Sequence, residues 1–200
     1  MIIITGSGRA GTSLLMQTLK IWKMPIAGMP FHPDFPVKSL NPRGYYDLPY
    51  KVLMAGVGLQ FKGMAVKVFG HWLNKVASEH VSKVIVCKRR SLTDQDNSLM
   101  KAYEAEVKVT SSSQERMEML EDIPTLQKLG VIRRNNYREV RKFLNRNKNI
   151  ESITVYFEDI LDNTKEEMTK IANFLNVDCE NIQDAIDNVQ PQEIQNGTCI

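Results

Sequence analysis

The sequence contains no long apolar run and few cysteines, and both absences exclude classes of protein. No segment approaches the roughly 18 consecutive apolar residues that a membrane-spanning helix needs. The three cysteines, Cys87, Cys179 and Cys199, have neither the paired spacing of a zinc site nor that of a disulfide framework. The apolar run at residues 2–4 is too short for a signal peptide, and glycines follow it at once. We therefore expect a protein of the reducing cytoplasm with no membrane partner.

A strong excess of charge is missing as well, because 26 basic and 23 acidic residues leave a formal net charge of only +3. Domains that bind nucleic acid usually carry a pronounced basic excess, so the composition gives no reason to expect a nucleic-acid partner. With 42% hydrophobic and 24% charged residues, the chain has the composition of a globular protein. Its length is sufficient for a proper core, and we expect one domain over residues 1–200.

Short apolar runs alternate along the chain with segments of helical length. This alternation predicts an α/β fold of three layers, in which helices flank a mostly parallel central sheet. The apolar runs predict strands at residues 1–5, 64–69, 83–87 and 152–157. The helical periodicity predicts helices over residues 12–22, from Leu92 onward, in two segments within 113–146, from Thr164 onward, and over 182–189.

Local signals mark some of these boundaries. Ser91 is placed as the N-cap of the helix that starts at Leu92, and Thr164–Glu167 has the pattern of a capping box. Residues 24–50 are rich in proline and glycine and are expected to form a long irregular loop. A loop of that length inside a compact domain is usually functional.

Glycine and hydroxyl residues are concentrated between the first strand and the first helix, in the run Gly6-Ser7-Gly8-Arg9-Ala10-Gly11-Thr12-Ser13. Glycines let the backbone wrap closely around an anion, and a helix N-terminus adds free N–H groups and a positive dipole end. Gly6 and Gly11 have the spacing of a Walker phosphate-binding loop, but Thr12 stands where nucleotide-hydrolysing enzymes have a lysine. Arg9 supplies a cation from within the loop instead. The loop therefore predicts phosphate binding without ordinary ATP or GTP hydrolysis.

This loop resembles the 5′-phosphosulfate loop of the sulfotransferases that use 3′-phosphoadenosine 5′-phosphosulfate (PAPS), a family with a P-loop-like fold. In that family a basic residue precedes a small residue, then Gly-Thr and a hydroxyl residue. The resemblance implies that PAPS is the cosubstrate and that the loop holds its 5′-phosphate and sulfuryl group. The residues that it assigns to this role are Gly8, Arg9, Ala10, Gly11, Thr12 and Ser13.

A second motif agrees with the first. The family ends a core strand with an arginine and has a serine eight positions later on the following helix, and both bind the 3′-phosphate of the nucleotide. Here Arg90 and Ser98 have that spacing, after the apolar strand that begins at Lys83. Arg89 is the alternative ligand, because Ser91 and Leu92 stand where the family has Asp or Asn and then Pro. The spacing favours Arg90 together with Ser98.

Three further stretches extend the resemblance over most of the chain. Residues 41–47, Asn-Pro-Arg-Gly-Tyr-Tyr-Asp, resemble the Asn-Pro-x-Gly-aromatic-aromatic-acid stretch of bacterial members. Residues 67–71, Lys-Val-Phe-Gly-His, resemble a Lys-Thr-Pro-x-His stretch. Residues 153–161, followed by 172–175, resemble the late strand, Glu-Asp-Leu turn and helix of the family.

Sulfuryl transfer moves an SO₃ unit from a phosphate leaving group to an acceptor oxygen or nitrogen. The resemblance implies that Arg9 and Lys67 stabilise the charge on the leaving phosphate. It also implies that Asp47 and His71 jointly take the acceptor's proton, with His32 as another candidate base. Because sulfate carries less charge than a terminal phosphate, the reaction demands no metal, and we see no carboxylate cluster that would hold one.

Taken together, these residues predict a sulfotransferase that moves a sulfuryl group from PAPS to the hydroxyl or amine of a small-molecule or glycan acceptor. Two alternatives stay open: a P-loop kinase that uses ATP and magnesium, and a non-catalytic nucleotide-binding relic of the fold. Residues 24–50 and 100–146 are expected to frame the acceptor pocket. The aromatic candidates to line it, or else to belong to the core, are Phe31, Tyr45, Tyr46 and Tyr103.

Overall fold

A four-stranded sheet with the order β2-β1-β3-β4 forms the centre of the computed structural model, and every pair of neighbours is parallel. The structure describes residues 1–31, 41, 43–109, 123–177, 183–187 and 189. The strands are β1 Ile2–Thr5, β2 Ala65–Lys67, β3 Lys83–Lys88 and β4 Glu151–Tyr156. Parallel neighbours require crossover connections, and the helices that make them cover both faces of the sheet. The predicted α/β fold with a parallel central sheet flanked by helices is confirmed.

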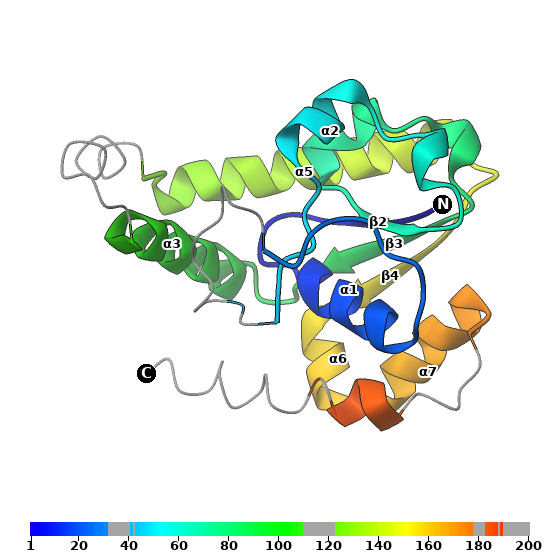
Figure 1. Ribbon diagram of the computed structural model, residues 1–200. Coiled ribbons are helices and arrows are strands. Elements are labelled where there is room, and N and C mark those ends of the chain that lie inside the picture. Colours follow the sequence, from blue (N-terminus) through cyan, green and yellow to red (C-terminus); the bar gives the residue numbers. More distant parts are fainter. Residues whose placement is uncertain (32–40, 42, 110–122, 178–182, 188, 190–200) are drawn as a thin grey trace.

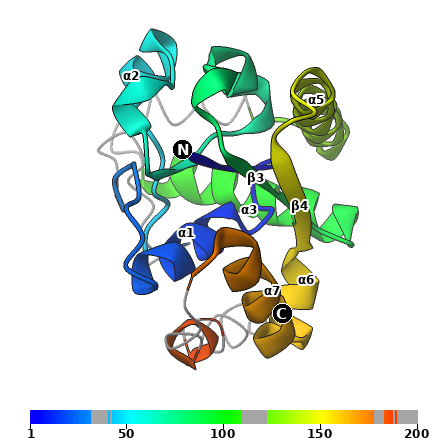
Figure 2. The same ribbon diagram turned by 90° about the vertical axis from the view of Figure 1, so that its right-hand side faces the viewer.

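Helices α1, α6 and α7 lie on one side of the sheet, and α2 and α5 lie on the other (Figures 1 and 2). The α-helices are α1 Thr12–Ile21, α2 Tyr50–Ala55, α3 Leu92–Val109, α5 Leu126–Arg146, α6 Phe157–Asp162 and α7 Thr164–Leu175. Short 3₁₀ helices join them: η2 Leu59–Phe61, η3 Gly70–Lys75 and η4 Ser78–His80. Among the described residues, no helix combines the length and the apolar character that spanning a membrane would require.

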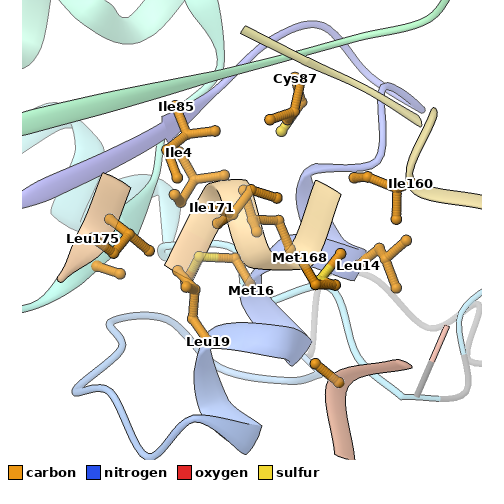
Figure 3. Close-up of a cluster of buried hydrophobic side chains, with 14 of the residues drawn as sticks. Ile4, Leu14, Met16, Leu19, Ile85, Cys87, Ile160, Met168, Ile171 and Leu175 are labelled. Carbon is orange, nitrogen blue, oxygen red and sulfur yellow. The ribbon is translucent and has the colours of Figure 1, made fainter. Parts of the chain in front are cut away.

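Two hydrophobic cores lie against the two faces of the sheet, because successive strand residues point to opposite sides. Ile4 and Ile85 face one core, which α1, α6 and α7 complete (Figure 3). Ile3 and Val84 face the other, which η3 and α5 cover. In β2 the same alternation places Lys67 on the side of α1, two residues after Ala65 of the first core.

The helix boundaries show which local signals act in the folded chain. Helix α3 begins at Leu92 as predicted, and Ser91 caps it by accepting a hydrogen bond from the backbone N–H of Asp94 at 3.2 Å. The prediction of a capping box at Thr164 is wrong. The N-cap of α7 is Asn163, and the Thr164 hydroxyl donates to the carbonyl of Leu161 at 3.2 Å. The reason is that α6 ends at Asp162, so the chain enters α7 from a helix rather than from an extended segment.

The long segment before β2 contains more structure than its composition indicates. The described part of residues 24–50 pairs with the sheet edge at Ile26 and Ala65, and Met29 bridges to Asp47. Helix α2 and the 3₁₀ helices η2 to η4 are not among the predicted elements. Of the two helices expected within 113–146, α5 is observed, and residues 110–122 lie outside the described part of the chain. Residues 183–187 of the expected last helix are helical.

Candidate functional site

The glycine-rich loop lies at the carboxyl end of β1, where ligands of open parallel sheets generally bind. Two of its glycines are required by their surroundings. A Cβ at Gly6 would lie 2.6 Å from the carbonyl oxygen of Cys87, and Gly11 has a φ of +91° with Phe157 Cδ2 2.8 Å from its Cβ position. Helix α1 has no side-chain N-cap and no acidic residue in its first turn. Its N-terminus therefore presents backbone donors and a positive dipole end next to the loop.

An alanine at Gly11 is expected to lower the free energy of unfolding by more than the same change at Gly63. Both glycines have positive φ, which costs an L-residue about 1–2 kcal/mol. Only Gly11 adds a clash with Phe157, because nothing lies within 4 Å of the Cβ position of Gly63. Urea denaturation of Gly11→Ala and Gly63→Ala measures the difference. Equal losses would show that the loop moves to accommodate the new Cβ atom.

Arg9 of the loop contacts Ser98 of α3, which joins two motifs that lie 89 residues apart in the sequence. The Arg9 Nε donates to Ser98 Oγ at 3.0 Å. Arg9 has a φ of +61°, in the left-handed region that few non-glycine residues adopt. Burial lowers the pKa of its guanidinium, and the nearby Tyr45 opposes that shift. The two predicted anion-binding residues thus lie side by side at one location.

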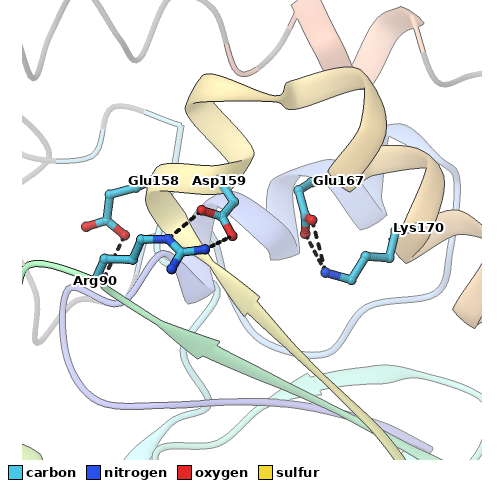
Figure 4. Close-up of polar contacts among 5 residues, drawn as sticks. All are labelled: Arg90, Glu158, Asp159, Glu167 and Lys170. Atoms are coloured by element: carbon cyan, nitrogen blue, oxygen red, sulfur yellow. Dashed lines mark hydrogen bonds and ion pairs between the residues drawn. The ribbon is translucent and has the colours of Figure 1, made fainter.

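Arg90 is directed toward α6 (Figure 4). Its guanidinium donates twice to the Asp159 carboxylate, from Nε and Nη2, each at 2.7 Å, and its backbone N–H donates to Glu158 at 2.9 Å. The side chain also lies over the ring of Tyr156, 4.6 Å from its centroid, and is 61% exposed. The Asp159 carboxylate raises the pKa of Arg90, and Arg90 lowers that of Asp159. In this arrangement the Arg90 guanidinium is occupied by a carboxylate, and Arg9 rather than Arg90 contacts Ser98.

Arg89 instead lies close enough to the loop for the charge of Arg9 to affect its pKa. Its guanidinium carbon is 4.3 Å from the ring centroid of Phe157, the ring that also abuts Gly11. Its buried Nε has no hydrogen-bond partner among the described residues. Burial lowers the pKa of Arg89, and repulsion from Arg9 lowers it further, against the attraction of Glu158. A buried donor without a partner is costly, so this Nε is a candidate to bind a ligand acceptor.

Other buried polar atoms without partners gather around the same loop. Besides Arg89 Nε they are Thr5 Oγ1, Ser7 Oγ and Gln95 Oε1. Gln95 is one turn before Ser98 on α3 and donates from Nε2 to the carbonyl of Gly8 at 2.7 Å. Native proteins leave few such atoms unsatisfied, and each one calls for an explanation such as a ligand or water. The Thr5 and Ser7 hydroxyls can donate to an anion at the place where the sequence predicts one, whereas Gln95 Oε1 can only accept a hydrogen bond.

Lys67 is the buried cation beneath the start of α1. It is 4% exposed, and its Nζ contacts Asp47 Oδ1 at 2.8 Å, Ser13 Oγ at 3.0 Å and the carbonyl of Tyr45 at 2.8 Å. These three partners match the three protons of an ammonium group. Burial lowers the pKa of Lys67, while Asp47 acts in the opposite direction. The structure thus brings together three predicted residues, one each from the loop, from residues 41–47 and from β2.

His71 stands at the start of η3 and is exposed. The Oδ1 of Asn136 lies 2.9 Å from both the backbone nitrogen and the Nδ1 of His71. The Phe69 ring contacts both predicted residues, with its centroid 6.3 Å from that of His71 and 5.1 Å from Lys67 Nζ. His71 and Lys67 thus share the Phe69 ring as a neighbour, and the structure shows no direct contact of His71 with Lys67 or Asp47. Asn136 is a residue that sequence reasoning missed.

The remaining candidates divide between core, backbone and undescribed residues. Tyr46 is 4% exposed and belongs to the first core, whereas Tyr45 contributes its carbonyl oxygen to Lys67 and Ser13. His32 lies outside the described residues. Within the part of the chain that the structure describes, no three His, Cys, Asp or Glu side chains are grouped so that they could hold a metal ion.

Comparisons with known proteins bear on the fold. No protein-family model and no curated protein matches the sequence. A solved structure that is similar to the chain is described as retinol dehydratase in complex with androsterone and inactive cofactor PAP, with 15% sequence identity and a TM-score of 0.52. The similarity covers 94% of this chain and 63% of the neighbour, so the chain spans less than two thirds of the neighbour's length. At this identity the similarity establishes a shared fold.

Proposed function

We propose that this chain is a sulfotransferase that moves a sulfuryl group from PAPS to the hydroxyl or amine of an acceptor. The proposal rests on the contact between Arg9 and Ser98. This contact joins the two motifs that resemble the two phosphate sites of the family. Arg89 supports the proposal, because its Nε has no partner among the described residues and because burial and the charge of Arg9 lower its pKa. The fold supports it too, because the neighbour's structure holds PAP, which matches the nucleotide left when PAPS gives up its sulfuryl group.

In this proposal the two ends of the nucleotide bind to different elements. The 5′-phosphate would lie on the backbone of Gly8–Ser13 and the first turn of α1, where glycines allow close approach. The 3′-phosphate would lie against Ser98 and Arg89, and we place Arg89 there in preference to Arg90. An arginine fork and a hydroxyl at this location offer charge-assisted hydrogen bonds, which are the strong kind.

The transfer itself needs a stabilised leaving group and a proton acceptor. The acceptor's lone pair forms a bond to sulfur, the bond from sulfur to the 5′-phosphate oxygen breaks, and its electron pair stays on PAP. Arg9 and Lys67 would stabilise the negative charge on that oxygen. The acceptor's proton would pass to His71. Asp47 pairs with Lys67, and we therefore assign it the role of holding Lys67 beneath the loop.

PAP is expected to raise the melting temperature without any metal. A ligand at 100 times its Kd adds about 2.7 kcal/mol to the free energy of unfolding, which corresponds to roughly 5–10 °C for a chain of this size. Adenosine 5′-phosphate, which lacks the 3′-phosphate, should give a much smaller shift. The measurement is a thermal shift in the presence of EDTA. Equal stabilisation by PAP and by adenosine 5′-phosphate would remove the 3′-phosphate site from the proposal.

ATP with magnesium is the comparison that separates this proposal from a P-loop kinase. Stabilisation by ATP alone, dependent on magnesium, would replace the sulfotransferase with the kinase. Binding of PAP without release of PAP from PAPS, across a screen of phenols, sugars and amines, would favour the non-catalytic relic.

A further inference from the structure

We propose that Asn136 of α5 is a positioning residue that fixes the tautomer and the orientation of His71, so that its Nε2 is the proton acceptor. This inference rests on the proposed function, because it gives a role to the residue next to the base of that reaction. It is carried by the geometry around one amide oxygen. Asn136 is 3% exposed, and its Oδ1 lies 2.9 Å from the backbone nitrogen and 2.9 Å from the Nδ1 of His71.

The chemistry of these atoms determines where the proton lies. A backbone N–H can only donate, so the Asn136 atom that it contacts must be the amide oxygen and not the amide nitrogen. An amide oxygen can only accept, so the Nδ1 beside it must carry a proton. A neutral imidazole with a proton on Nδ1 has a free lone pair on Nε2. Asn136 therefore selects the form of His71 that can accept a proton from Nε2.

Asn136 is itself held in place. Its Nδ2 donates to the carbonyl of Ile132 at 3.1 Å, which fixes the direction of the amide plane. Gly70, next to His71, packs so closely on α5 that a Cβ there would lie 2.2 Å from the Asn136 carbonyl oxygen. This close approach explains why a glycine precedes His71, since any side chain would push η3 and its histidine away from α5.

Neighbouring residues of α5 anchor the helix to the nucleotide side of the site. Arg133 donates from Nε and Nη2 to Asp96 of α3, each at 2.9 Å, and Tyr137 donates to the carbonyl of Cys87 at 3.1 Å. Asp96 is two residues before Ser98 on α3. Helix α5 thus contacts α3, the end of β3 and η3, and Asn136 is the position from which it orients His71.

The rings beside His71 restrict its plane as well. Phe69 stacks on it with an interplanar angle of 7°, and Trp72 contacts it at a centroid distance of 5.1 Å. These contacts limit rotation of the ring but cannot distinguish its two nitrogens. The tautomer therefore depends on Asn136, and this dependence separates its role from that of ordinary packing.

The test is ¹⁵N NMR of the full chain with labelled histidine, with and without PAP. The chain has three histidines, so His32→Gln and His80→Gln variants assign the signals. We expect His71 to show a protonated Nδ1 and an unprotonated Nε2 in the wild-type protein. Asn136→Leu, which has similar size but no acceptor, should abolish this pattern, with the His80 signals unchanged.

Two results would overturn the inference. The first is a wild-type His71 protonated on Nε2, a result that does not depend on whether any variant folds. The second is an Asn136→Leu variant that keeps the wild-type pattern. Failure of the proposed function is separate, because calorimetry that detects no PAP binding would count against that function while the tautomer of His71 is still read in the free protein.

Discussion

An Arg89→Ala variant will lose most of its affinity for PAP, whereas Arg90→Ala will keep it. Arg89 has a buried Nε without a partner among the described residues, and burial and the positive charge of Arg9 lower the pKa of Arg89. Arg90 is occupied by Asp159. A hydrogen bond to a charged group contributes about 1.5–3 kcal/mol, so removing Arg89 should raise the Kd about 10- to 100-fold. Isothermal titration calorimetry with PAP, at one fixed salt concentration, measures both variants.

The stability of the free protein provides the control for this pair. Arg89→Ala removes a cation–π contact with Phe157, worth about 0.5–1 kcal/mol, but it also removes a buried unsatisfied donor, which costs about 1–3 kcal/mol. The variant should therefore be at least as stable as the wild type without ligand and weaker only in binding. Loss of PAP affinity in Arg90→Ala with retention in Arg89→Ala would mean that Arg90 leaves Asp159 when the nucleotide binds, and would restore the assignment by spacing.

The choice between these two arginines shows where local pattern stops being informative. The loop, the strand ends and the start of α3 follow from short-range signals, namely glycine spacing, apolar runs and a capping serine. The direction of Arg90 depends on Asp159, which belongs to α6, a helix expected only as a turn. The alternation of side chains along β3 was a signal that could have identified Arg89. Ile85 and Cys87 face the core on the α1 side, and continuing that alternation places Arg89 on the same side.

The partners of Lys67 and His71 required tertiary structure for a different reason. Lys67 and Asp47 are each singled out by the sequence, but their contact depends on the pairing of residues 26–29 with the sheet edge and with Asp47. Asn136 lies within a long polar helix, where one more asparagine is not by itself a signal of function. A signal exists there too: Asn136 stands on the buried stripe of α5 between Leu129 and Val140, where an apolar residue is the usual choice.

Breaking the buried pair of Lys67 and Asp47 is expected to be strongly destabilising. Replacing Asp47 with asparagine leaves the Lys67 ammonium, 4% exposed, without its counter-charge, and removal of one member of a buried pair typically costs about 3–5 kcal/mol. Lys67→Met should cost a similar amount, and the double variant should cost less than the sum. The exposed pair of Arg90 and Asp159 is the matched control, and Asp159→Asn should have little effect.

The pH dependence of the same variants identifies Lys67 as the cause. Burial lowers the pKa of Lys67 in the folded chain, so between its folded and unfolded pKa values the unfolded chain binds more protons. The cost of burying the charge is therefore fully present below the folded pKa and is relieved as the pH rises through it. The free energy of unfolding of the wild type should rise relative to that of Lys67→Met on the alkaline side. Burial raises the pKa of Tyr137 to about 12, which contributes to stability in the opposite direction. Tyr137 is present in both proteins, so comparing them by urea denaturation at each pH cancels its contribution. Parallel curves for the two proteins would contradict a charged, buried Lys67.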